Sequence, residues 1–451
     1  MCGIVASLGL GSSGVVESGL RSISHRGIRS RIVELGSAGV MGHVRLPIVG
    51  VGEENDQPVR SYPWTIAFVG EVFGFRRLRP DLDCDLGLVV ERWTECGPGG
   101  FADLDGFWSV VAWDSRTGRL HCLVDYLSQK PLYVGRVRGG VVVSSEPRVF
   151  GECPDSPPLD RIYLSACVKW GYCPEVWRTP YEGVRRLLPG EYAVLSEDKV
   201  ESLERVDVLT PRPGDLVSLV ESAVRDRVES SDVPVAVLVS GGLDSAIVYT
   251  LASRYGDVRT YHVENGEREA YRRVCRGGTV LTPDGCSIRR AVDYMQEPVD
   301  LGSLVPQVSL SDAMGSTGGE RVCLTGDGAD EMFGGYSRAS RYDSQASDVF
   351  HELVGWHFPR LDRVMMRNQI EVRSPFLSRR VVEAALALPR GARIDKRVLR
   401  ESFRSILPPG VADEPKRALR TSRVESDRES WSRILVEEFV RNYEEGRRCR
   451  G

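Results

Sequence analysis

A short glycine-rich segment near the middle of the chain has residue types that bind phosphate. The mostly β-branched run Val233–Val239 ends in Ser-Gly-Gly at 240–242, and an apolar helical pattern resumes after Asp244. This order predicts a parallel strand, a tight turn and the first turn of a helix. Glycines let the backbone approach an anion closely, and the free amides at a helix start point toward it. The Gly-Lys-Ser/Thr spacing of common nucleotide hydrolases is missing.

A second glycine-rich loop carries carboxylates. The apolar run Val322–Thr325 leads directly into Gly-Asp-Gly-Ala-Asp-Glu at 326–331. The carboxyl ends of parallel strands meet at one edge of a sheet, so we expect Asp244 and Asp330 to converge there. Two carboxylates together with phosphate oxygens suit Mg²⁺. Either loop alone is also compatible with an ordinary turn, but the pair predicts a site for Mg²⁺ and phosphate groups.

The other chemically distinctive residue is Cys2. Removal of Met1 would leave a cysteine whose α-amine serves as the base for its own thiol, without a histidine partner. A buried free cysteine is common, so Cys2 alone is weak evidence. Short apolar segments separated by glycines follow it and predict a β-rich layered domain. Strands are predicted at 43–51, 64–73, 107–114, 120–125 and 141–145, and helices at 14–24 and 86–96.

Length and composition set the outer limits. A chain of 451 residues is long for one core, so two domains are expected. A net charge of -4 with 41% apolar residues gives no overall electrostatic reason to bind nucleic acid. Eleven cysteines without a Cys-x-x-Cys pair indicate reduced thiols in the cytoplasm. No apolar run reaches membrane-spanning length and no export signal is visible, which also predicts an intracellular location.

The patterns place a domain boundary at about residue 205. The charged, proline-flanked segment 197–213 predicts a linker. After it, strands alternate with helical segments and end in glycine-rich loops, which predicts a doubly wound α/β domain. We therefore expect domains at 1–205 and 206–451. The elements expected in the second domain are helices at 216–228 and 433–450 and strands at 233–239, 259–264 and 322–325.

The first domain resembles the class II glutamine amidotransferase domain, an N-terminal-nucleophile hydrolase of αββα fold. The resemblance implies that Cys2 is the nucleophile and that Arg45 binds the α-carboxylate of glutamine. It also implies that Gly70 lies in the oxyanion hole and that Glu71 and Asp85 bind the amino group, which fits their donor and acceptor chemistry. The matching segments are Met1-Cys2-Gly3-Ile4, His25-Arg26-Gly27, His43 to Val49, Gln57-Pro58, Gly70-Glu71 and Pro131-Leu132-Tyr133.

One departure from this family bears directly on activity. The family has Asn-Gly-Glu where this chain has Val69-Gly70-Glu71, so an amide side chain of the oxyanion hole is replaced by an apolar one. Loss of one such donor typically costs about 10²- to 10³-fold in rate. We therefore expect glutamine binding to be largely retained and glutamine hydrolysis to be slow unless the Gly70 amide suffices.

The second domain resembles the ATP-pyrophosphatase domain of glutamine-hydrolysing asparagine synthetases. Beyond the two glycine-rich loops, the matches are Glu297-Pro298-Val299, Glu371-Val372-Arg373, Pro375-Phe376-Leu377, Lys396-x-x-Leu399-Arg400 and Pro415-Lys416. The resemblance implies that ATP adenylates the side-chain carboxylate of aspartate and that ammonia then displaces AMP. In the family, the residues at Glu297 and Lys416 act near this chemistry, a carboxylate as a proton acceptor and a lysine as a charge stabiliser.

The same resemblance assigns the ligand-binding residues. Asp244 and Asp330 would hold Mg²⁺. ATP would be bound by Leu238, Ser240, Gly241, Gly242, Asp244, Ser245, Val263, Gly326 and Asp327.

The leading interpretation is an asparagine synthetase that uses ATP, Mg²⁺, aspartate and glutamine or ammonia. Two alternatives stay open. The segment between Asp244 and Glu297 is short for an asparagine synthetase, which leaves room for another acceptor, such as a tRNA deazapurine or a peptide carboxylate. Val69 leaves room for a catalytically weakened binding protein. We expect small-molecule substrates and no membrane association, and a homodimer is left open.

Overall fold

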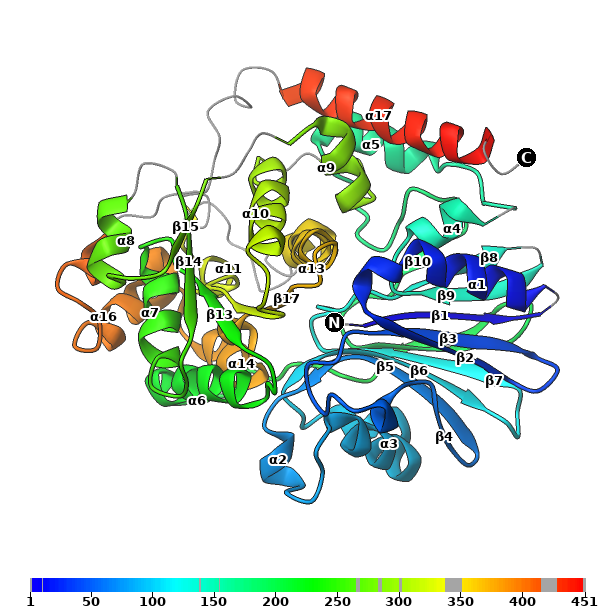
Figure 1. The fold of residues 1–451 in the computed structure, drawn as a ribbon, viewed down its shortest axis with the longest axis horizontal. Coiled ribbons are helices and arrows are strands. Elements are labelled where there is room, and N and C mark those ends of the chain that lie inside the picture. The colour runs from blue at the N-terminus through cyan, green and yellow to red at the C-terminus, as the bar shows by residue number, and fades with distance from the viewer. Residues whose placement is uncertain are drawn as a thin grey trace.

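The computed structural model describes residues 2–9, 11–137, 139–153, 155–264, 268–282, 286–299, 302–336, 351–414 and 428–448. It consists of an N-terminal half, which contains β1 to β12, and a C-terminal half, which contains α6 to α17 (Figure 1). Within the described residues, no helix is both long enough and apolar enough to cross a membrane.

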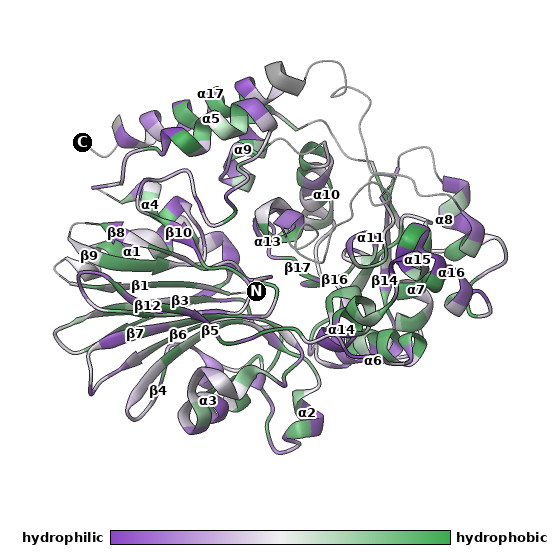
Figure 2. Cartoon of the chain, turned by 180° about the vertical axis from the view of Figure 1, so that it is seen from behind, coloured by the Kyte–Doolittle hydropathy of each residue, from purple (hydrophilic) through white to green (hydrophobic). Residues whose placement is uncertain are grey.

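The N-terminal half is built from two stacked antiparallel sheets. Their strand orders are β10-β8-β9-β1-β3-β2 and β12-β11-β7-β6-β5-β4. Helices α1 and α4 cover the outer face of the first sheet and α3 covers that of the second (Figure 1). Because both faces of the central strands are covered, their residues are apolar almost without alternation, as in Phe107–Ala112. Figure 2 shows this apolar colouring over both sheets.

The bounds of the elements in this half follow. The strands are β1 Gly3–Leu8, β2 Arg29–Glu34, β3 Gly39–Arg45, β4 Val59–Ser61, β5 Trp64–Val72, β6 Gly106–Asp114, β7 Arg119–Val124, β8 Tyr133–Val137, β9 Gly140–Ser144, β10 Arg185–Arg186, β11 Glu191–Leu195 and β12 Val200–Arg205. The helices are α1 Ser12–Ser22, α2 Phe75–Leu78, α3 Asp85–Cys96, α4 Arg148–Glu152 and α5 Arg161–Trp170.

The C-terminal half is a five-stranded parallel sheet in the order β15-β14-β13-β16-β17, with helices on both faces. Alternate residues of β13 face opposite layers. Val235 and Val237 pack in the cluster that contains α6 and α7, whereas Ala236 packs against residues of α10 and α13. Helix α17 lies along α5 of the N-terminal half (Figure 1).

The bounds in this half follow. The strands are β13 Val235–Leu238, β14 Arg259–Val263, β15 Thr279–Leu281, β16 Val322–Leu324 and β17 Glu371–Arg373. The helices are α6 Leu216–Glu229, α7 Leu243–Ala252, α8 Arg268–Val274, α9 Ile288–Met295, α10 Leu304–Thr317, α11 Ala329–Met332, α13 Phe358–Met366, α14 Arg379–Ala387, α15 Arg390–Arg393, α16 Arg397–Phe403 and α17 Arg428–Arg448, with a π-helical turn at Leu353–His357.

The predicted fold class, an αββα layer followed by a parallel α/β sheet, is confirmed. Two local predictions were wrong. The predicted linker at 197–213 contains β12, an exposed edge strand that pairs with β11. The side chains of β12 are exposed and mostly polar, as in a linker, because the strand is held by backbone hydrogen bonds to β11 and not by side-chain packing. The predicted strand at 43–51 ends at Arg45, just before Leu46-Pro47.

Candidate active sites

Cys2 precedes β1, the strand at the centre of the first sheet, and its thiol is half-buried. The Sγ atom lies 4.0 Å from the carbonyl oxygen of Leu46, just beyond β3. Burial raises the pKa of the Cys2 thiol, and the Arg45 guanidinium partly offsets this while the Glu71 carboxylate adds to it. Because Leu46 follows Arg45 directly, its contact with the thiol places Cys2 beside the end of β3.

Arg45 is the last residue of β3 and is buried. Its guanidinium donates to Asp56 Oδ1 (2.9 Å) and to the carbonyls of Gly52 (2.6 Å), Val49 (3.2 Å) and Gly50. These bonds fix the guanidinium against the 49–56 loop. All four N–H groups of its two terminal nitrogens are used in these bonds, so a bound carboxylate would have to replace some of them.

The backbone of Gly70 has an unusual conformation, with φ of 137°. A Cβ atom there would lie 1.9 Å from the carbonyl oxygen of Phe107, so only glycine fits. Gly70 is paired with Trp108 of β6, but the backbone groups of Trp108 bond to Asp125 on the other side. The Trp108 amide donates to the Asp125 carboxylate (3.1 Å), and the Asp125 amide donates to the Trp108 carbonyl (3.0 Å). The Gly70–Trp108 pair is therefore of the non-hydrogen-bonded kind.

The amides on either side of Gly70 show where its own amide points. Phe68 donates to Gln57 Oε1 (2.6 Å) and Val72 donates to Asp85 Oδ2 (2.8 Å), both on the edge of β5 that faces away from β6. Backbone direction alternates with a period of two along a strand, so the Gly70 amide points to this same edge. It is therefore available to an oxyanion, whereas the side chain of Val69 is buried in the core and offers no donor.

Glu71 and Asp85 lie together at the end of β5, although they are on different elements. Burial raises the pKa of Asp85 to about 6, despite the bond from the Val72 amide. Burial raises the pKa of Glu71 well above its ordinary value, and the carboxylates of Glu371 and Asp85 raise it further. A cationic ligand would relieve this crowding of negative charge, which fits the amino group of an amino acid.

The glycine-rich turn after β13 is held by its own serine hydroxyls. Ser245 Oγ contacts the Ser240 amide (3.1 Å), the Ser240 hydroxyl (3.0 Å) and the Gly242 carbonyl (3.1 Å). Gly241 has φ of 89°, and a Cβ atom there would lie 2.6 Å from the backbone of α8. The turn therefore needs glycine for both its conformation and its packing.

A lysine links the two glycine-rich loops. Lys396 Nζ lies 2.5 Å from Asp244 Oδ2 and 2.5 Å from Asp330 Oδ1. Although burial opposes it, the two carboxylates hold the pKa of Lys396 above its ordinary value. Lys396 itself has a left-handed backbone with φ of 55°. The predicted convergence of Asp244 and Asp330 thus occurs around one buried ammonium. Lys396 is not among the site residues that the sequence predicts, although its Lys-x-x-Leu-Arg segment belongs to the resemblance.

The remaining expected ATP-binding residues lie along the same edge of the sheet. Leu238 and Val263 are the last residues of β13 and β14, and both are half-buried. Gly326 and Asp327 follow β16. A Cβ atom on Gly326 would lie 2.7 Å from Cβ of Asp244, so the two loops are in direct contact.

Glu297 lies at the junction of the two halves. Its carboxylate is fully buried and bonds with Arg186 of the N-terminal half (2.8 and 3.0 Å) and with Arg363 of α13 (2.7 Å). Neither of these arginines belongs to the glycine-rich loops. Lys416 lies outside the described residues.

Comparisons with known proteins agree with this geometry. Residues 1–205 match the model of the glutamine amidotransferase domain, and residues 215–357 and 344–442 match that of asparagine synthase. The chain belongs to the asparagine synthase family. Its relatives include asparagine synthetase B of Escherichia coli, 26% identical over 87% of this chain and 76% of that protein, and the asparagine synthetase of Sandersonia aurantiaca, 26% identical over 89% and 82%.

The family binds ATP, and the donor set around Lys396 suits the metal that ATP carries. Among the described residues, no group of three His, Cys, Asp or Glu side chains could hold a metal by itself. Asp244 and Asp330 supply two carboxylates, and phosphate oxygens would complete the coordination of Mg²⁺. The residues therefore fit a metal that arrives with the nucleotide.

We predict that Asp330→Asn weakens binding of ATP in the presence of Mg²⁺ by about 10- to 100-fold, because a carboxylate that holds both Lys396 and the metal is lost. Isothermal titration calorimetry with and without Mg²⁺ measures this. Asp395→Asn is the matched control, because Asp395 adjoins Lys396 but is 73% exposed. Equal affinities of the two variants would contradict the assignment.

Proposed function

We propose that this carbon–nitrogen ligase makes asparagine from aspartate and ATP, with glutamine or ammonia as the nitrogen source, through a β-aspartyl-AMP intermediate. The observation that carries the proposal is the convergence of Asp244 and Asp330 on Lys396 beside the glycine-rich turn. In this arrangement the amides of the turn bind the pyrophosphate part of ATP. Mg²⁺, held by the two carboxylates, would neutralise charge on the departing pyrophosphate.

The N-terminal half would supply the ammonia. Cys2 attacks the side-chain amide of glutamine, Arg45 binds its α-carboxylate, and Glu71 and Asp85 bind its ammonium. The Gly70 amide receives the oxyanion, and this chain relies on that amide because Val69 provides no second donor.

Glu297 and Lys416 are proposed to act near the acceptor carboxylate, as the resemblance implies. The Glu297 carboxylate is bonded by Arg186 and Arg363 at the junction of the two halves. We further propose a boundary at 205/206 between the two catalytic units, and a cytoplasmic location.

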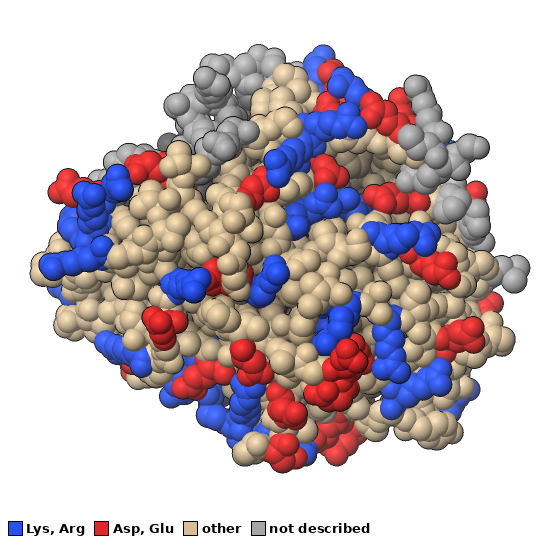
Figure 3. All heavy atoms as spheres, viewed as in Figure 1, with Lys and Arg blue, Asp and Glu red and all other residues tan. Residues whose placement is uncertain are grey.

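A second candidate keeps the adenylating chemistry and changes the acceptor to another carboxylate or a tRNA base. The short segment between Asp244 and Glu297 favours it. On the face drawn in Figure 3, cationic and anionic side chains are interspersed, which favours a small acceptor over a polyanion. A third candidate, a weakened binding protein, is favoured by Val69 and opposed by the intact Asp244–Lys396–Asp330 arrangement.

The first prediction is that pyrophosphate release from ATP and Mg²⁺ requires aspartate, with asparagine formed faster from ammonium than from glutamine. Coupled pyrophosphate detection and amino-acid analysis measure both products. Absence of aspartate-dependent release from folded protein would exclude asparagine synthesis and redirect the search to other acceptors.

The second prediction is that Val69→Asn raises the rate of glutamine hydrolysis by about 10²- to 10³-fold, because it adds an oxyanion donor. Val69→Leu, which is close to asparagine in shape and has no hydrogen-bond donor, is the matched control. Glutamate release without ATP is the measurement, and an unchanged rate would show that the Gly70 amide already suffices.

The third prediction concerns pH. Asp85 must be ionised to accept hydrogen bonds from the glutamine ammonium, and its pKa is about 6. We therefore expect kcat/KM for glutamine to rise between about pH 5 and about pH 7 as the proton leaves. Asp85→Asn should lower and flatten this part of the profile, whereas Asp83→Asn, at an exposed position two residues away, should leave it unchanged. The same rise in the Asp85→Asn enzyme would assign the titration to another group.

A further inference from the structure

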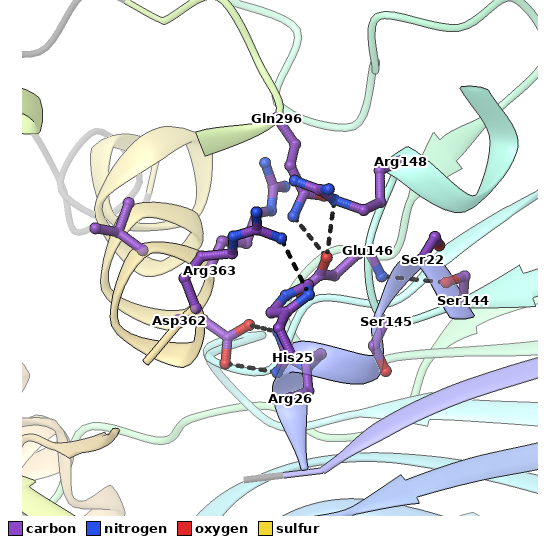
Figure 4. Close-up of polar contacts among 12 residues, drawn as sticks. Ser22, His25, Arg26, Ser144, Ser145, Glu146, Arg148, Gln296, Asp362 and Arg363 are labelled. Atoms are coloured by element: carbon purple, nitrogen blue, oxygen red, sulfur yellow. Dashed lines mark hydrogen bonds and ion pairs between the residues drawn. The ribbon is translucent and has the colours of Figure 1, made fainter. Parts of the chain in front are cut away.

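The backbone of the candidate nucleophile is held from the other half of the molecule through one arginine. Arg26 Nε donates to the carbonyl oxygen of Cys2 (2.8 Å). Its two terminal nitrogens donate to both carboxylate oxygens of Asp362 in α13 (2.9 and 3.1 Å), and one of them also donates to Glu146 (2.8 Å). Figure 4 shows Arg26 between Asp362 and the strands of the first sheet.

All members of this arrangement are buried. Arg26 is 1% exposed, and the side chains of Glu146 and Asp362 are 0% and 2% exposed. Burial pushes the pKa of Asp362 upward, but Arg26 and Lys130 outweigh it and hold that pKa below the ordinary value. A bidentate arginine–carboxylate pair in such surroundings has one geometry, so the position of Asp362 fixes the position of Arg26.

A second contact between the halves reaches the other end of the glutamine site. Arg373, the last residue of β17, lies 3.4 Å from Glu71 and donates to Glu371 (2.7 Å). Its guanidinium is anchored by the carbonyls of Arg227 (2.7 Å) and Ser230 (2.9 Å) at the end of α6. Arg373 thus supplies the positive charge that offsets the crowding of carboxylates around Glu71.

We propose that Asp362 and Arg373 of the C-terminal half are positioning residues for glutamine hydrolysis in the N-terminal half. The inference rests on the proposed role of Cys2 as the glutaminase nucleophile. Asp362 acts through Arg26 on the backbone of Cys2, so it sets the rate of the chemical step. Arg373 acts through Glu71 on the ammonium pocket, so it sets the affinity for glutamine. Glutamine hydrolysis therefore depends on how the two halves are packed.

The test compares three variants in glutamate release without ATP. Asp362→Asn keeps the shape of the side chain and loses its charge, and we expect kcat to fall by about 10- to 100-fold with KM within about twofold. Arg373→Lys keeps a charge but loses the fork, and we expect the opposite pattern, a KM raised by about tenfold or more with kcat little changed. Asp362→Glu, which restores the charge, should recover part of kcat.

Asp293→Asn is the matched control. Asp293 lies at the same junction and pairs with Arg367 (2.7 Å) and Arg148 (3.3 Å), but it is half-exposed and does not contact Arg26. It should keep wild-type kcat and KM. Thermal unfolding of every variant separates a loss of rate from a loss of folding.

A direct readout of Cys2 separates this inference from the proposed function. The rate of alkylation of Cys2 by iodoacetamide, followed by peptide mass spectrometry, needs no turnover. If the wild-type enzyme hydrolyses no glutamine, the proposed glutaminase function fails, yet Asp362→Asn should still change the alkylation rate and Asp293→Asn should not. The proposal would be overturned if Asp362→Asn kept the wild-type kcat and the wild-type alkylation rate. It would also be overturned if all variants lost kcat and gained KM in the same proportion.

Discussion

Buried charge between the two halves must be paired, and much of the structure follows from this constraint. An unpaired ion in the interior costs several kcal/mol, whereas a bidentate arginine–carboxylate pair largely offsets its own desolvation. The junction contains buried arginine–carboxylate pairs, among them Arg26–Asp362 and Arg186–Glu297. Each of them joins residues far apart in the chain, so the relative placement of the two halves is fixed by geometry and not only by apolar contact.

The same rule shapes the edge of the parallel sheet. Asp244 and Asp330 follow strands β13 and β16, which are neighbours in the sheet, and their charges meet at Lys396. Two carboxylates so close together need a balancing positive charge. The Lys396 ammonium provides it, and under the proposed function it would contact phosphate oxygens once ATP binds.

The proposed glutamine site combines buried polar groups with an apolar neighbour. Arg45, Glu71 and Asp85, the residues proposed to bind glutamine, are buried, and the Gly70 amide points to the open edge of β5. Val69 offers no hydrogen-bond donor. We therefore expect this enzyme to bind glutamine with ordinary affinity but to hydrolyse it slowly. The proposed binding groups are present, whereas one group that would stabilise the transition state is absent.

Much of the fold was predictable from local patterns. Apolar runs, glycine turns and helical periodicity in the sequence determined the β-rich first half, the parallel sheet of the second half and the two loops that carry Asp244 and Asp330. Strand β12 was predicted as a linker although its partner β11 is its neighbour in the sequence. A strand held by backbone pairing at an exposed edge needs no apolar side chains, so its sequence gives no strand pattern.

The tertiary structure alone decided which charges meet. Local spacing gives no information on contacts between residues hundreds of positions apart, so neither the Arg26–Asp362 pair nor the place of Lys396 between two aspartates could be derived from it. It also decided that Glu297 lies between two arginines at the junction. The sequence by itself thus determined the chemical groups and the layers that carry them. Packing determined which groups are paired, because a buried charge is removed from water and can pair only with the groups that the fold brings next to it.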